Sequence, residues 1–196
     1  MNAPIQPKTR RGRTRRAEIL RAAERVIGRL GFADASISEI TREAGTAQGT
    51  FYIYFSSKEQ VFRELVAEMG LLTRKVLAEA ISPADSRLDA ERRGLKAFLA
   101  FVADHPALYR IVEEARFVDP PAYKDYFTSF AEAYRRQLKR AAASGTIRPG
   151  DPEVRAWALM GIAKTLGERY VLWGDADDLD RIAEEAFDLI RRGLEP

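Results

Sequence analysis

Residues 36–59 narrow the possible folds of this chain more than any other stretch. The spacing Ser-x-x-Glu occurs at positions 36–39 and again at 56–59, each time ahead of apolar residues. Such a capping box starts a helix, because the hydroxyl accepts from a free backbone N–H and the carboxylate accepts from the capping residue's own amide. Gly45, between the two boxes, suits a turn that needs positive φ. The stretch therefore predicts a short helix ending at Gly45, a second at about 47–54, and a long helix to about residue 80.

The remaining sequence also follows a helical pattern. Apolar residues from about position 15 to 30 recur at intervals of three and four, and Gly31 supplies a helix stop. Pro106 and Pro152 fall near helix starts, where a missing N–H costs least. No segment alternates apolar and polar residues as a strand does. Further helices are predicted at 85–104, 106–116, 120–143, 152–173 and 177–193. The expected fold class is all-α, with about nine helices arranged as a small N-terminal module and a larger C-terminal one.

The composition excludes several kinds of chemistry. The 196 residues contain no cysteine and one histidine, His105. Disulfides, thiolate metal sites and cysteine nucleophiles are therefore impossible, and a His-rich metal site or a serine–histidine relay is disfavoured. No stretch approaches the ~18 apolar residues of a membrane helix, and the N-terminus lacks the apolar region of a secretory signal. We expect a cytoplasmic protein with no membrane partner, no metal, no cofactor and no catalytic residue.

Basic residues are concentrated in the first third of the chain. Residues 1–58 hold eleven Lys or Arg and five Asp or Glu, whereas residues 59–196 hold 21 and 24. Such an asymmetry is typical of a protein that binds a polyanion through one module. Residues 1–13 lack apolar periodicity and are predicted to be a basic mobile arm. Two interpretations of this arm stay open: it follows the DNA backbone or enters a minor groove, or it is a solvated tail.

Two short helices joined by a turn containing glycine describe a helix-turn-helix, whose second helix enters the DNA major groove. Residues 40–62 read ITREAGTAQGTFYIYFSSKEQVF. This run resembles the DNA-binding signature of the tetracycline-repressor (TetR) family of transcriptional regulators. The matching positions are Ala44-Gly45, Gly49-Thr50-Phe51-Tyr52, Tyr54-Phe55 and Lys58-Glu59. The resemblance covers residues 15–65 in detail. The rest of the chain matches in being helical and of the right length.

The resemblance and the side-chain chemistry together assign roles in DNA binding. Gln48 stands where the family often has lysine, and it can contact adenine through two hydrogen bonds. Thr50, Tyr52, Tyr54 and Lys58 occupy positions that contact phosphates in the family. For the tyrosines the alternative is core packing, and for Gln48 and Thr50 it is plain exposure to solvent. Phe51 and Phe55 are expected in the core. The predicted DNA-binding residues are Ser36, Ser38, Thr46, Gln48, Gly49, Thr50, Tyr52, Ile53, Tyr54 and Lys58.

The resemblance also implies dimerisation through the last two long helices, because two modules are needed to span two half-sites. Small residues on the first of these helices allow close approach, and the second carries an apolar stripe. The alternative is packing within one chain. The predicted dimer interface is Ala158, Gly161, Thr165, Ile182, Phe187 and Ile190.

Residues 98–134 contain nine of the nineteen aromatic residues. Aromatic side chains at helical spacing form a core, but they also line pockets between the helices of a bundle. The resemblance implies an effector pocket here. The predicted pocket residues are Phe98, Phe101, Tyr109, Phe117, Tyr123, Phe127, Phe130, Tyr134, Trp157, Met160 and Lys164. The domains implied are the arm at 1–13, a helix-turn-helix (homeodomain-like) domain at 14–57, and an effector-binding and dimerisation domain at 58–196.

The function implied is a sequence-specific, homodimeric regulator that binds a palindromic double-stranded DNA operator. Repression, with release on binding of a small hydrophobic effector, rests on the resemblance alone. One alternative is a constitutive or architectural dimeric DNA-binding protein without an effector. A DNA-binding enzyme is disfavoured, because no phosphate-binding glycine loop or metal-ligand spacing is present.

Overall fold

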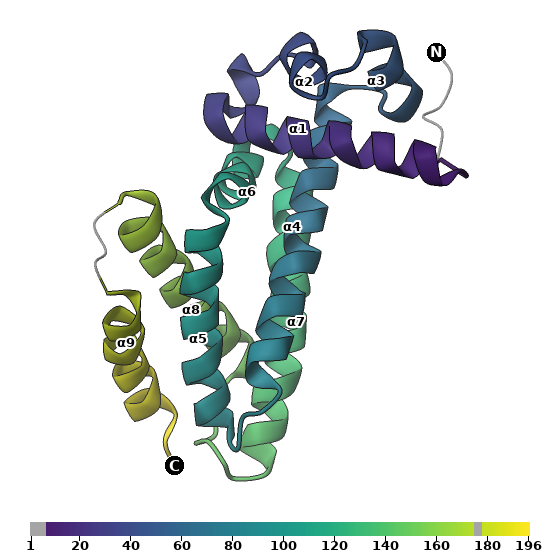
Figure 1. The fold of residues 1–196 in the computed structure, drawn as a ribbon. Coiled ribbons are helices and arrows are strands. Elements are labelled where there is room, and N and C mark those ends of the chain that lie inside the picture. The colour runs from purple at the N-terminus through teal and green to yellow at the C-terminus, as the bar shows by residue number, and fades with distance from the viewer. Residues whose placement is uncertain (1–6, 175–177) are drawn as a thin grey trace. The chain divides into compact units, whose positions relative to one another are not determined.

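The computed structural model describes residues 7–174 and 178–196, and every regular element in these ranges is helical (Figure 1). The prediction of an all-α chain with about nine helices is confirmed for this part of the chain. The elements are α1 Arg10–Asp34, α2 Ile37–Glu43, α3 Gln48–Tyr54, α4 Lys58–Ile81, α5 Arg87–Asp104, α6 Pro106–Val118, α7 Pro120–Ala143, α8 Pro152–Gly167, η1 Glu168–Leu172 and α9 Leu179–Leu194.

Helix α1 begins earlier than the apolar periodicity predicts. Residues 10–13, expected in the mobile arm, are helical, and the hydroxyl of Thr9 accepts from the N–H of Gly12 at 3.1 Å. A capping hydroxyl satisfies a free amide, which explains the early start in a run without apolar residues. The chain turns at Gly31, whose φ of 80° suits glycine, and then resumes helical geometry to Asp34.

Two other predicted boundaries also need correction. The helix expected at 152–173 ends at Gly167 and continues as the π-helical turn η1, in which the N–H of Trp173 donates to the carbonyl of Glu168 at 3.1 Å. The last helix was expected from residue 177, which lies outside the described residues, and α9 begins at Leu179.

The helices form two compact units. The first contains the chain up to Met69 together with Ala107–Lys124, and the second contains Gly70–Pro106 and Asp125–Pro196. Helix α4 therefore contributes to both, and α6 belongs to the first unit. The predicted boundary at residue 58 concerns function and stays a prediction.

The core of the first unit is built from large apolar side chains of α1–α4 and α6. Phe51 and Phe55 are fully buried, which confirms their predicted place, and their ring centroids lie 5.5 Å apart. Phe32 packs edge-on against Phe62 at 4.9 Å. Burial of rings of this size fixes α3 against its neighbours.

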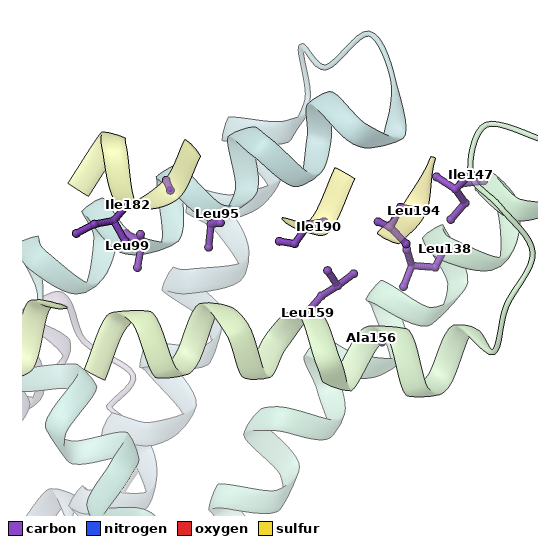
Figure 2. Close-up of a cluster of buried hydrophobic side chains, with 11 residues drawn as sticks. Leu95, Leu99, Leu138, Ile147, Ala156, Leu159, Ile182, Ile190 and Leu194 are labelled. Carbon is purple, nitrogen blue, oxygen red and sulfur yellow. The ribbon is translucent and has the colours of Figure 1, made fainter. Parts of the chain in front are cut away.

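In the second unit, α9 packs along α5 over an apolar cluster that α7 and α8 complete (Figure 2). The side chains of Ile182 and Ile190 point into this cluster together with Leu95, and both isoleucines are buried. Both side chains are thus covered within one chain, and their place in a dimer interface stays a prediction. An amphipathic stripe must be buried somewhere, and here α5 and α8 of the same chain cover it.

Candidate DNA-binding surface

The start of α2 is the predicted capping box. The hydroxyl of Ser36 accepts from the N–H of Glu39 at 3.1 Å, and the carboxylate of Glu39 accepts from the Ser36 N–H at 3.0 Å and its hydroxyl at 2.8 Å. These hydrogen bonds from Ser36 lower the pKa of Glu39. The Ser36 hydroxyl thus has a structural role beside its predicted phosphate contact, while Ser38 is exposed.

The cap of α4 is shifted by one residue from its predicted position. The N–H of Gln60 donates to the hydroxyl of Ser57 at 3.2 Å, and the side-chain carbonyl of Gln60 accepts from the N–H of Ser56 at 2.7 Å. Ser57 therefore takes the capping place expected for Ser56, and Gln60 accepts from the residue before this cap. Glutamine serves as well as glutamate in this motif, because an amide oxygen also accepts.

Helix α3 has one buried and one exposed face. Phe51 points inward, whereas Tyr52 and Ile53 are 51% and 47% exposed and Gln48 and Gly49 lie in solvent. Exposed aromatic and aliphatic side chains on a short, well-packed helix are suited to contacts in a DNA groove. The alternative interpretation, in which the Tyr52 ring packs in the core, is therefore excluded.

The remaining predicted residues of α3 and its turn meet the N-terminus of α1. Thr46, Thr50 and Tyr54 are half-buried and line a hollow of about 390 Å³. The other wall is made by Thr9, Arg11, Gly12 and Arg15. A Cβ added at Gly12 would lie 2.9 Å from the Pro7 Cβ, which is too close, and at an ordinary contact distance of 3.6 Å from the Tyr54 hydroxyl oxygen. Hydroxyls and guanidiniums facing one hollow suit a phosphate group.

The arginines of the predicted arm and of the following turn of α1 have different roles. Arg16 forms an ion pair with Glu64, and its guanidinium lies 4.6 Å from the Phe55 ring centroid. Arg13 donates to the carbonyl of Lys8 at 3.0 Å. Arg11 and Arg15 line the hollow, although Arg15 also pairs with Glu18 at 2.9 Å. The sequence placed these basic residues together without showing which of them face α3.

Lys58 differs from its predicted role. Its ammonium donates to the carbonyl oxygens of Phe32 and Ala35, the latter at 2.6 Å, and lies 4.2 Å from the Phe32 ring centroid. A phosphate would have to displace these carbonyls, so this side chain holds the end of α1 in the structure, and its contact with DNA stays a prediction.

The same connection is held by α6. Both carboxylate oxygens of Glu114 accept from the N–H of Phe32 at 3.1 Å. Nearby, the guanidinium of Arg63 donates to Asp119 at 2.7 Å. Burial raises the pKa of Asp119, but hydrogen bonds from the Ala122 N–H and Arg63 outweigh it, so that the pKa is lowered. These contacts bind α6 and the start of α7 into the unit that carries α3.

Several predicted pocket residues are not where the sequence suggested. Phe117 is 82% exposed at the end of α6, and Trp157 is exposed on α8, where its indole N–H donates to Glu153 at 2.8 Å. Both side chains are exposed, and their place in an effector pocket stays a prediction. Phe101 and Tyr109 are buried. The half-buried members are Phe98, Tyr123, Phe127, Phe130, Tyr134, Met160 and Lys164. Tyr109, Phe117 and Tyr123 belong to the first unit and the other eight to the second.

Tyr134 is part of a buried polar cluster in the second unit. Its hydroxyl donates to Glu91, which is 4% exposed, and the guanidinium of Arg87 donates to the same carboxylate at 2.8 Å. Arg87 also donates to Gln137 at 2.6 Å. Burial raises the pKa of Glu91 and, with the adjacent Glu91, raises the pKa of Tyr134 well above its usual range. Sequence spacing alone could not reveal this cluster, which joins α5 to α7.

On α8, the predicted interface residues Ala158, Gly161 and Thr165 are exposed, as are Val154 and Trp157. Phe187 on α9 is half-buried.

Among residues 7–174 and 178–196, no group of three or more His, Cys, Asp or Glu side chains could hold a metal ion. Within the same ranges, no helix has both the length and the apolar character to cross a membrane.

Comparison with known proteins shows which proteins this chain resembles. Residues 19–65 match the sequence model of "Bacterial regulatory proteins, tetR family". The chain is 28% identical over 189 residues to the uncharacterized HTH-type transcriptional regulator YdgC of Bacillus subtilis, covering 92% of this chain and 93% of that protein. It is 28% identical over 196 residues to the HTH-type transcriptional regulator EthR of Mycolicibacterium smegmatis, covering 94% and 89%.

A solved structure shares the fold. The transcriptional regulator FadR from Bacillus subtilis, in complex with stearoyl-CoA, superposes with a TM-score of 0.78 at 19% identity, covering 89% of this chain and 96% of that one. The matched residues 19–65 contain α2, α3 and the start of α4. Residues 19–65 therefore match the tetR family model, and the chain is similar over most of its length to HTH-type transcriptional regulators.

Proposed function

We propose that this protein is a homodimeric repressor that leaves a palindromic operator when a small hydrophobic effector binds its C-terminal module. The observation that carries the DNA-binding part is the surface of α3, where Gln48, Tyr52 and Ile53 are exposed beside the hollow at the start of α1. The resemblance to the family supports repression, and action on DNA supports the proposal that the protein is cytoplasmic. We propose no catalytic role.

The exposed face of α8 supports the dimer. Val154, Ala158, Gly161 and Thr165 recur at intervals of four, three and four, so they share one side of the helix. Nothing lies within 4 Å of a Cβ built on Gly161, which leaves room for another helix to approach closely. A monomeric mass by light scattering at micromolar concentration would contradict this part of the proposal.

The effector part rests on the aromatic side chains of α5 and α7 and on a neighbour's ligand. FadR from Bacillus subtilis, which shares the fold, was solved with stearoyl-CoA. An effector that favours one conformation of the second unit would lower DNA affinity by shifting the populated state. Helix α4 is suited to transmit this shift, because it begins at the DNA-binding surface and extends into the second unit.

Selection of bound sequences from a random DNA pool tests the function. We expect a palindrome whose half-sites lie about 34–36 Å apart or a multiple of this. Gln48→Ala should relax the preference at one position per half-site, whereas Thr50→Ala should weaken binding to all sequences alike. Recovery of no preferred sequence would favour the architectural alternative and overturn the proposal.

A further inference from the structure

Helix α7 carries a ladder of aromatic rings within the second unit. Tyr126, Phe130 and Tyr134 follow one another at intervals of four, and the rings of Tyr126 and Phe130 lie 5.1 Å apart. Two guanidiniums lie over this ladder. Arg87 is 5.4 Å from the centre of the Tyr134 ring, and Arg74 is 5.3 Å from the centre of the Phe130 ring.

These two arginines differ in their polar partners. Arg87 is neutralised by the buried carboxylate of Glu91, with a nitrogen–oxygen distance of 2.6 Å, and donates also to Gln137. The side chain of Arg74 forms no ion pair and no hydrogen bond with any residue that the structure describes. One stacked guanidinium therefore has its anion built into the fold, and the other does not.

The rings of Phe130 and Tyr126 lie close to Arg74. It is half-buried on α4, and a Cβ added at Gly70, one turn earlier, would lie 3.3 Å from the Arg74 Nη1 and 3.3 Å from the Tyr126 ring. Tyr126 itself is buried. A half-buried guanidinium is less fully solvated than one at an open surface, so an anion that paired with it would gain more than it would there.

We propose that Arg74 binds the anionic group of an amphipathic effector whose apolar chain packs along the aromatic side chains of α7. A guanidinium can stack on a ring and at the same time donate two parallel hydrogen bonds to a carboxylate or a phosphate. The ligand class is thus an acyl chain with an anionic group, found both in free fatty acids and in acyl-CoA thioesters. The inference rests on the proposed function, since it specifies the effector.

The test compares three probes with one chain length: dodecanoate, dodecanoyl-CoA and the neutral dodecanol. Binding to the full-length protein is measured by calorimetry, below the concentration at which the probes aggregate. We expect at least one anionic probe to bind more tightly than dodecanol. Arg74→Gln should weaken that probe by roughly 10- to 100-fold and leave dodecanol unchanged. A loss confined to dodecanoate identifies a carboxylate site, and a loss confined to dodecanoyl-CoA identifies a phosphate site.

Two control measurements separate a ligand contact at Arg74 from a general charge effect and from a structural role. Lys75→Gln removes the same charge from the next position on α4, where the side chain is 72% exposed, and should leave all three affinities unchanged. The melting temperature of Arg74→Gln without ligand should stay within about 3 °C of wild type, because the substitution removes no ion pair. A purely structural role would lower it.

Equal binding of the anionic probe by wild type and Arg74→Gln, or no preference of the wild type for an anion over dodecanol, would overturn the inference. Its failure can be separated from failure of the proposed function. If Arg74→Gln binds the selected operator and is still released by dodecanoate, only the role of Arg74 is wrong. If neither protein prefers any DNA sequence, the proposed function is wrong, whatever the ligand measurements show.

Discussion

The buried cluster of Arg87, Glu91 and Tyr134 makes a sharp prediction about stability. The Glu91 carboxylate accepts from Arg87 and from the Tyr134 hydroxyl, and the Arg87 side chain is only 11% exposed. Glu91→Leu therefore leaves a buried guanidinium without its anion and a buried hydroxyl without its acceptor. Breaking a buried pair in this way costs about 3–5 kcal/mol, which corresponds to a fall of roughly 6–20 °C in melting temperature for a chain of this length.

The same reasoning predicts recovery when the partners are also removed. Arg87→Met combined with Glu91→Leu removes both charges, and Tyr134→Phe in addition removes the orphaned hydroxyl. The triple variant should be within about 1–2 kcal/mol of wild type or more stable, because apolar side chains of similar volume do not incur the cost of burying charge. Urea unfolding followed by circular dichroism measures each variant, at one protein concentration because the proposed dimerisation would contribute to stability.

An exposed pair provides the control. Lys75 and Glu79 lie 4.0 Å apart at the same spacing along a helix, but their side chains are 72% and 67% exposed. Glu79→Leu should change stability by less than about 1 kcal/mol. A loss below about 1 kcal/mol for Glu91→Leu, or a triple variant no more stable than Glu91→Leu alone, would show that the cluster is not the closed network the geometry describes.

The cluster also has a predicted pH dependence. Burial raises the pKa of Glu91, with Arg87 and the Tyr134 hydroxyl opposing this effect. A carboxyl whose pKa is higher folded than unfolded stabilises the fold below its unfolded pKa, and this contribution is lost as the pH rises through the folded value. Relative to Glu91→Gln, wild type should therefore lose stability as the pH rises from about 4 towards neutrality. A relative gain in that window would reverse the sign and contradict the reasoning.

Three further predictions concern the first unit. Tyr54→Phe should weaken operator binding by roughly tenfold or more in a gel-shift titration, since the hydroxyl faces the hollow, while the melting temperature changes little; unchanged affinity would remove this hydroxyl from the interface. Phe51→Ala should cost about 3–5 kcal/mol in urea unfolding because the ring is fully buried, whereas the exposed Phe117→Ala should stay within about 0.5 kcal/mol; similar losses would contradict the burial. Gly31→Ala should cost about 1–2 kcal/mol, since the φ of 80° disfavours a side chain and Glu114 lies 3.0 Å from the added Cβ; an unchanged midpoint would refute this.

Local signals explain what the sequence predicted well. The capping box at Ser36, the positive φ of Gly45 and the inward-facing Phe51 each depend on residues within one or two turns. Such features depend on local hydrogen bonds between residues whose types and short spacing can be read directly from the sequence. The shift of the second cap from Ser56 to Ser57 shows the limit, because two adjacent serines offer equivalent hydroxyls and the spacing does not distinguish between them.

Predictions that depended on a distant partner were less reliable. The apolar stripe on α9 correctly indicated a buried face, but α5 and α8 of the same chain cover Ile182 and Ile190. Lys58 was expected at a phosphate, and the carbonyls that hold it come from the end of α1, more than twenty residues earlier. Periodicity identifies which side of a helix is buried, but it carries no information about which surface covers that side.

The aromatic residues of α7 show the same limit at the level of chemistry. Phe130 and Tyr134 looked equivalent as pocket-lining rings, yet Tyr134 is tied to the carboxylate of Glu91, and Phe130 lies under an arginine that has no such partner among the described residues. The difference arises on α5, which supplies Glu91 beside Arg87 and supplies no acid beside Arg74. Ring type and spacing therefore predicted only that one face of α7 is covered by other side chains. The two arginines differ in one carboxylate: Glu91 pairs with Arg87 and closes a polar cluster, whereas Arg74 has no such partner in the described part of the chain and is available to an anionic ligand.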